Sequence, residues 1–184
     1  MAMMSGKREA DIIPFRSKPK QREFAAQKEA GGLQQALLQI TLQGRSDRLE
    51  GAKTLEKLGS PMAFKPALVA AEREPDSEVR YHLIKVLNSI PTQDFRRPGD
   101  TVPRLERLIR GERDDKVVWE AALALHHFSY DRTDAMERLI ALEEDIRRRY
   151  IALEVSEQVA FAISGAITEI MTVDTRWAAL TFIL

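Results

Sequence analysis

Residues 79–90, VRYHLIKVLNSI, and residues 117–128, VVWEAALALHHF, decide the fold class. In both stretches the apolar residues recur at spacings of i, i+4, i+7, i+8 and i+11, which follow one face of an α-helix. The positions are Val79, Leu83, Val86, Leu87 and Ile90 in the first stretch, and Val117, Ala121, Ala124, Leu125 and Phe128 in the second. Because no run alternates strictly between apolar and polar residues, the sequence predicts an all-α chain.

The striped pattern occurs a third time and alternates with a second kind of helix. Gly51, Ala52, Leu55 and Leu58 fit the same stripe. Between the stripes, prolines at positions 66 and 103 each stand two residues before a leucine, and segment 135–139 has the leucine without the proline. Proline suits the first turn of a helix, where its missing N–H would have no partner. Two helix types that alternate at intervals of 32 to 38 residues predict a repeat of stacked helical pairs.

The segments 59–68 and 74–87 resemble HEAT repeats of the short bacterial type, which also occur in phycobilin-lyase-like proteins. The resemblance covers roughly residues 44–142. It implies a short right-handed α-solenoid of about three helical pairs with capping helices. It also implies ion pairs between repeats, made by an acidic residue and an arginine six residues later. Glu74 and Arg80 have this spacing, but Val118 follows Glu112, so we expect an incomplete set of ion pairs and stacking dominated by apolar contacts.

Charge and hydropathy divide the chain into three parts. Residues 1–30 carry seven Lys or Arg and four Asp or Glu, and we expect them to form a flexible N-terminal tail. Residues 31–149 form the HEAT-like body. Residues 150–184 are a strongly apolar C-terminal capping segment, which we expect to pack on the last repeat or on another chain. The second alternative would make the protein an oligomer or part of a hetero-complex.

The residue types present exclude several functional classes. The chain has no cysteine, which rules out disulfides, thiolate nucleophiles and cysteine-ligated metals. His82, His126 and His127 stand in no metal-binding or catalytic motif, and the sequence has no phosphate-binding glycine loop or nucleophile elbow. We therefore expect no enzymatic activity, no metal and no cofactor. The N-terminus has no secretory signal and no segment is long enough to span a membrane, so we expect a soluble cytoplasmic protein.

The most prominent polar cluster is rich in arginine. On a helix, Arg104, Arg107 and Arg110 would form a ridge beside an apolar seam, and Arg96 and Arg97 stand in the long loop before it. Guanidinium groups at such positions can bind carboxylates or phosphates with two hydrogen bonds. The alternatives are a solvated helix face, a surface for an acidic protein, and a surface for nucleic acid or another phosphate ligand. The sequence pI of about 6.9 makes nucleic acid the less favoured partner.

These observations predict a non-catalytic interaction module, a scaffold or adaptor that presents a concave surface to a protein partner. A second contact is expected at the apolar island Ile12, Ile13, Pro14 and Phe15 in the tail, unless this island folds back on the protein or is merely solvated. Two alternatives remain. The arginine ridge could bind nucleic acid or a phosphate ligand, or the chain could be an accessory subunit of a lyase-like HEAT complex.

Overall fold

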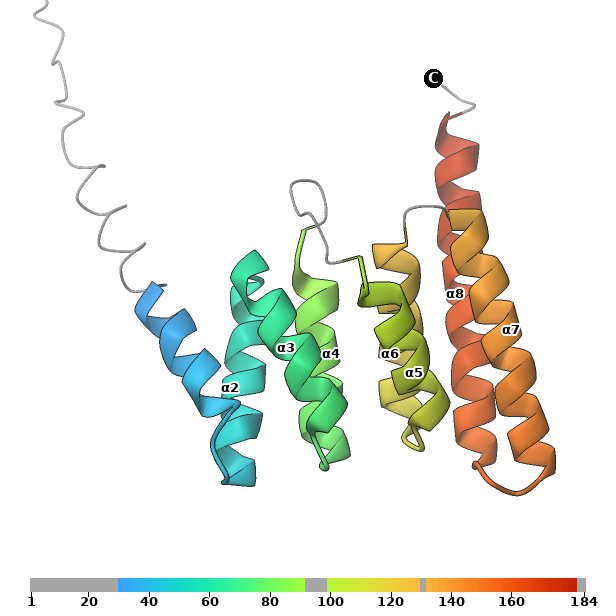
Figure 1. Cartoon of the computed structure of the whole chain (residues 1–184). Helices are drawn as coiled ribbons and strands as arrows, with labels where there is room; N and C mark the ends of the chain where they lie inside the picture. The colour runs from blue at the N-terminus through green and yellow to red at the C-terminus, as the bar shows by residue number, and fades with distance from the viewer. Residues whose placement is uncertain (1–29, 92–98, 130–131, 182–184) are drawn as a thin grey trace, which may run out of the picture.

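A computed structural model describes residues 30–91, 99–129 and 132–181, with side chains placed except at 132 and 174–181. These residues form helices and short connections without any β-strand, which confirms the all-α prediction (Figure 1). A first helix covers residues 30–39. The following helices are α2 (Arg45–Leu58), the 3-10 turn η1 (Pro61–Ala63), α3 (Phe64–Arg73), α4 (Ser77–Ser89), α5 (Thr101–Gly111), α6 (Asp115–Phe128), α7 (Arg132–Ile151) and α8 (Glu157–Thr181).

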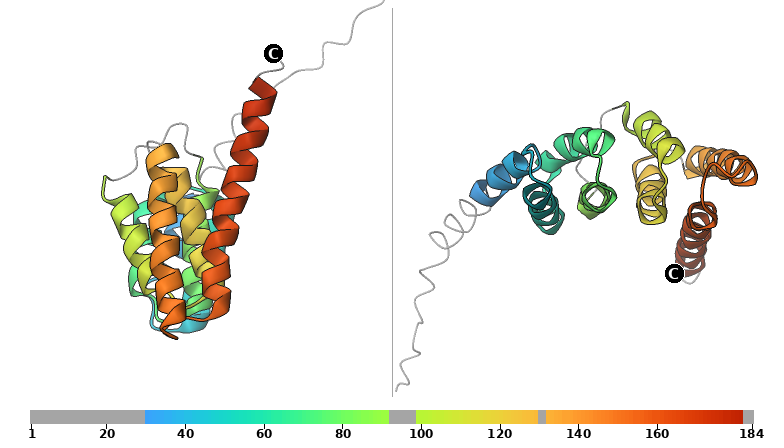
Figure 2. Two further views of the ribbon diagram at one scale, coloured as in Figure 1. Left: turned by 90° about the vertical axis from the view of Figure 1, so that its right-hand side faces the viewer. Right: turned by 90° about the horizontal axis from the view of Figure 1, so that it is seen from below.

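Consecutive helices pair into antiparallel hairpins that stand side by side in two layers. Helix α3 pairs with α4, α5 with α6, and α7 with α8 (Figure 1). Seen end-on, α2, α4, α6 and α8 form one layer, while the first helix, α3, α5 and α7 form the other (Figure 2). The row curves, and the layer of α2, α4, α6 and α8 lies on the inner, concave side of the curve. We call these the inner layer and the outer layer.

The predicted stripes form the core between the two layers. Every stripe residue in segments 79–90 and 117–128 is buried. In α2, Gly51, Ala52 and Leu55 are buried, whereas Leu58 is only partly buried. Gly51 lies where α2 crosses the first helix, so closely that a Cβ there would be 2.7 Å from Cβ of Gln39. The prolines at positions 66 and 103 are both the third residue of their helix, as the sequence predicts.

The C-terminal segment repeats the architecture of the hairpins before it. Helix α7 ends at Ile151, so it extends past residue 150, where the sequence analysis places the start of the apolar C-terminal segment. Helix α8 packs on α6 and α7. It carries the same i, i+4, i+7, i+8, i+11 stripe as α4 and α6, and all five of its residues are buried: Val159, Ile163, Ala166, Ile167 and Ile170. The pair α7 and α8 is therefore built like α3 with α4 and α5 with α6.

The turns that lead into α4 and α6 are built alike. Each contains a glutamate followed two residues later by an aspartate that caps the inner helix. Asp76 Oδ1 accepts a hydrogen bond from the backbone N–H of Val79 at 3.1 Å, and Asp114 Oδ1 accepts one from Val117 at 3.2 Å. Such caps provide acceptors for N–H groups that have no partner inside the helix.

The two glutamates of these turns bind arginines of the preceding hairpin. Glu74 accepts hydrogen bonds from Nε and Nη2 of Arg48 at 2.8 and 3.0 Å, and Glu112 accepts them from Nε and Nη2 of Arg80 at 2.5 and 3.1 Å. Both glutamates are almost completely buried, with exposed fractions of 7% and 5%. The Nη1 group of Arg80 donates in addition to the backbone carbonyl of Glu74. We call these four side chains the turn ladder.

The turn ladder is incomplete, as the sequence predicts. Glu74 and Arg80 both belong to the ladder but to different pairs, since the carboxylate of Glu74 binds Arg48, 26 residues earlier, and Arg80 binds Glu112. The ladder therefore joins α2 to the turn before α4, and α4 to the turn before α6. It ends where Val118, which is fully buried, takes the equivalent position in α6.

Candidate binding surface

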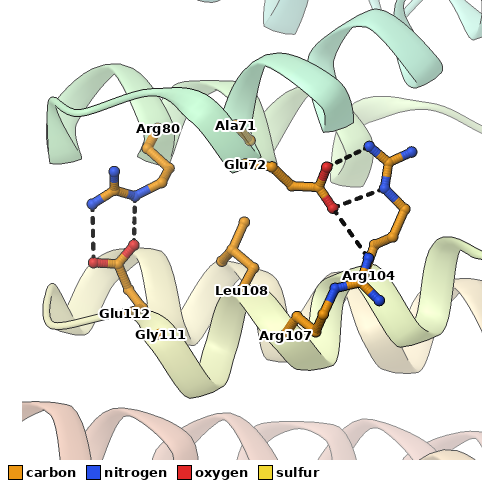
Figure 3. Close-up of a pocket in the computed structure, with 8 residues that line it drawn as sticks. All are labelled: Ala71, Glu72, Arg80, Arg104, Arg107, Leu108, Gly111 and Glu112. Atoms are coloured by element: carbon orange, nitrogen blue, oxygen red, sulfur yellow. Dashed lines mark hydrogen bonds and ion pairs between the residues drawn. The ribbon is translucent and has the colours of Figure 1, made fainter.

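The arginine ridge lies on the outer layer, and its members bind carboxylates of the neighbouring helices. Arg104 donates from Nε to Oε1 of Glu72 on α3 at 2.8 Å, and its side chain is only 12% exposed (Figure 3). Arg107 lies 3.7 Å from the same carboxylate and is largely exposed. Arg110 pairs with Asp145 on α7 at 3.2 Å. Hydrogen bonds from Arg104 hold the pKa of Glu72 below its usual range.

These pairs connect successive outer helices. Glu72 on α3 binds Arg104 on α5, and Glu106 on α5 binds Arg138 on α7 at 2.8 Å, with the same separation of 32 residues. The pocket between α3 and α5, of about 430 Å³, has an arginine–carboxylate pair near each end (Figure 3). Because its charges are largely neutralised by each other, this groove offers little to an external anion. Arg96, Arg97 and the tail residues Ile12, Ile13, Pro14 and Phe15 lie outside the described residues.

A row of aromatic side chains crosses the inner layer. The fifth residue of the helix is aromatic in three of the inner helices: Tyr81 in α4, Trp119 in α6 and Phe161 in α8. In α2 the fifth residue is Leu49. Tyr81 and Trp119 are partly buried against the core, whereas Phe161 is 66% exposed. Equivalent positions of neighbouring helices face the same side of the layer, so the three rings line one strip of the concave face.

Two neighbouring pockets follow the inner face of α6 between α4 and α8, and together we call them the groove along α6. Its first part, a pocket of about 500 Å³, is lined by all three aromatic residues and by residues at the start of α6. Its second part, of about 250 Å³, lies toward the end of α6 and is lined by Asn88, Leu123, Ile170 and Val173 among others. Glu120 borders both parts. The groove therefore has aromatic walls at one end, aliphatic walls at the other, and a carboxylate in the middle.

The position of Trp119 depends on a glycine in α8. A Cβ atom added at Gly165 would lie 2.3 Å from Cζ3 of the Trp119 ring and 3.0 Å from Cη2. No side chain other than hydrogen fits there while the indole keeps its place. Gly165 thus lets α8 approach α6 closely enough for Trp119 to form part of the wall of the groove.

We expect Gly165→Ala to lower the free energy of unfolding by about 1–3 kcal/mol, since the added methyl group must displace the indole or push α8 outward. Urea denaturation followed by circular dichroism measures this loss. Gly111→Ala is the matched control, because a Cβ at Gly111 meets nothing within 4 Å. Equal stability of the two variants would contradict the close contact between Trp119 and Gly165.

Polar side chains bridge the inner helices beside the aromatic row. Glu56 on α2 lies 2.7 Å from Nδ1 of His82 and 2.9 Å from Nζ of Lys85, both on α4. Burial raises the pKa of Glu56, but the bonds from His82 and Lys85 outweigh it and leave that pKa lowered. Asn88 on α4 donates to the Glu120 carboxylate at 2.8 Å. These contacts fix the relative positions of α2, α4 and α6.

His82 and His127 have positions consistent with structural roles. His82 belongs to the bridge with Glu56, and Nε2 of His127 lies 3.5 Å from the carbonyl oxygen of Ile90. Within the described segments, no group of three or more His, Asp or Glu side chains is arranged to hold a metal ion. Among those same segments no helix has the length and apolar character needed to cross a membrane.

The groove was not anticipated from the sequence, although a signal for it exists. In each inner helix the aromatic residue stands two positions after the first residue of the stripe: Tyr81 after Val79, Trp119 after Val117, and Phe161 after Val159. Alignment of the stripes therefore reveals the row. This alignment requires that the stripe of α8 be recognised as equivalent to the stripes of α4 and α6.

Comparison of the chain with protein-family models, with curated proteins and with solved structures gave no match.

Proposed function

We propose that this protein is a short right-handed α-solenoid of the HEAT-like type that acts as a non-catalytic scaffold or adaptor. Its concave inner layer would bind a segment of a partner protein along α4, α6 and α8. Support for the solenoid comes from the alternation of inner and outer helices, the shared stripe and the turn ladder. Solenoids present extended concave surfaces of this kind to their partners.

The aromatic row is the observation that carries this proposal. An exposed phenylalanine and two partly buried rings occupy the same position in three successive inner helices. Aromatic residues are enriched at the centre of protein interfaces, and tryptophan and tyrosine are among the residues that most often dominate the binding energy. The ion pairs of Arg104 and Arg110, in contrast, already join the outer helices, which favours the inner layer over the arginine ridge as the main binding surface.

Affinity capture from a lysate of the source organism tests the proposal. We expect wild-type protein and Met62→Ser to retain the same set of proteins, and Phe161→Ser to lose at least one of them, as measured by mass spectrometry. Met62 is a suitable control because it is an exposed apolar residue, at 73%, outside the inner layer. A set that Phe161→Ser leaves unchanged would contradict binding at the aromatic row.

Two further variants test the other surfaces that the sequence proposes. Arg107→Glu probes the arginine ridge without removing the Arg104–Glu72 pair, and Phe15→Ser probes the tail island. Loss of a protein with Phe15→Ser would place a second contact in the tail. Capture of nucleic acid that is lost with Arg107→Glu and at high salt would instead favour the phosphate-binding alternative.

A further inference from the structure

The groove along α6 carries an excess of negative charge. Its walls contain the carboxylates of Asp115, Glu120 and Glu169 and one ammonium group, that of Lys116, in addition to two histidines near the end of α6. A ligand that places acidic groups in this groove would meet repulsion from these carboxylates. A ligand that carries positive charge would be attracted to them.

Glu120 is the carboxylate best placed to select the ligand. It borders both parts of the groove and is partly buried on α6. Its carboxylate accepts a hydrogen bond from Asn88, which is a neutral amide, while the nearby ammonium of Lys85 is bound to Glu56 at 2.9 Å. Burial raises the pKa of Glu120, against the lowering effect of the Asn88 bond. Because this burial disfavours the ionised carboxylate, a cation that paired with Glu120 would relieve the cost.

The aromatic walls suit the same kind of ligand. The rings of Tyr81, Trp119 and Phe161 line the part of the groove that Glu120 borders. A guanidinium or ammonium group above an aromatic face gains cation–π energy, and a guanidinium can also stack on the ring while it binds a carboxylate. Apolar side chains of the ligand can contact Phe161, whose ring is exposed.

We propose that the groove along α6 binds a basic peptide segment of a partner protein, with an arginine or lysine held between Glu120 and Trp119 and an apolar side chain against Phe161. This inference rests on the proposed function and specifies the chemistry of the partner. It distinguishes the inner layer from the arginine ridge, for which the sequence predicts acidic ligands.

Selection of peptides from a phage-displayed library of random 12-residue sequences on the full-length chain tests this proposal. We expect the selected peptides to be enriched in Arg or Lys together with aromatic or aliphatic residues. A synthetic copy of the most enriched peptide should bind Glu120→Gln about ten-fold more weakly or worse, since a charge-assisted hydrogen bond is lost. Glu144→Gln on the outer helix α7 removes the same charge elsewhere and should bind like wild type.

The Glu120→Gln variant is suited to this test because glutamine retains an oxygen that can accept the bond from Asn88. Since burial raises the pKa of Glu120, removal of the charge should leave the melting temperature at neutral pH unchanged or higher. A loss of peptide binding can then be separated from a loss of folding by a thermal melt of the same sample.

The other outcomes separate this inference from the proposed function. Selection of acidic or neutral peptides that fail to bind Phe161→Ser would overturn the basic ligand while leaving the inner layer as a binding surface. A selection that yields no peptide sensitive to Phe161→Ser would overturn both proposals.

Discussion

Glu112→Ala is expected to lower the free energy of unfolding by about 3–5 kcal/mol, because it leaves the Arg80 guanidinium without its carboxylate in a site where the arginine side chain is only 18% exposed. The same change removes the acceptor for the backbone N–H groups of Arg113 and Asp114, which bind Glu112 Oε1 at 2.8 and 3.0 Å. Urea titration followed by far-ultraviolet circular dichroism measures the loss as a shift in midpoint.

A double variant shows whether the unpaired charge causes this loss. Arg80→Met with Glu112→Gln removes both charges and keeps an acceptor oxygen for the backbone amides, so it should recover about half of the lost stability or more. In α6 the position equivalent to Arg80 is occupied by an apolar residue, Val118, which is buried. Arg107→Ala, at an exposed ion pair, serves as the control and should change stability by less than about 1 kcal/mol. A double variant as unstable as Glu112→Ala would contradict the argument from charge.

The helices and the core were predictable because they depend on local periodicity. The residues from Val79 to Ile90 and from Val117 to Phe128 repeat at the helical period, and burial of one helix face follows directly from that. The same reasoning applies to α8, but its stripe is harder to recognise in the sequence. Apolar residues also occupy exposed positions of this helix, such as Phe161, Met171 and Val173. The composition therefore predicts a segment that is apolar throughout and does not show which face is buried.

The partner of each residue in these ion pairs could not be predicted from spacing along the chain. Arg48 and Glu74 are 26 residues apart, and Arg104 and Glu72 are 32 apart, so each pair exists only because the hairpins stack in one register. The amphipathic pattern correctly places Arg104 opposite the apolar seam. It does not reveal that the polar side of α5 faces α3 as well as solvent, which is why an arginine that looks available in the sequence is only 12% exposed.

The inner groove required both kinds of information. The identity of its residues is visible in the sequence, but the convergence of Tyr81, Trp119 and Phe161 on one strip follows from the stacking of α4, α6 and α8. The close approach at Gly165 sets the position of the central ring. A glycine inside a helix does not by itself predict a close contact, because the contact depends on a side chain of another helix, here Trp119, that occupies the space beside it.

Phe128→Ala is expected to destabilise the protein by about 3–5 kcal/mol, since it removes a fully packed ring from the junction between two hairpins. Phe128 at the end of α6 is 1% exposed and meets Phe64, the first residue of α3, edge to face with the ring centroids 4.8 Å apart. Leucine at either position keeps most of the apolar volume. A double-mutant cycle with Phe64→Leu and Phe128→Leu should show a coupling of about 0.5–1.5 kcal/mol from the ring contact.

Phe161→Ala is the informative control for Phe128→Ala, because both residues are phenylalanines of the inner layer. Phe161 is 66% exposed, so Phe161→Ala should change the free energy of unfolding by about 0.5 kcal/mol or less. If Phe161→Ala proved as destabilising as Phe128→Ala, the ring would be part of the core and the groove would lose its exposed wall. If it left stability unchanged, the exposed ring would contribute little to folding, which is what a side chain that serves a partner requires.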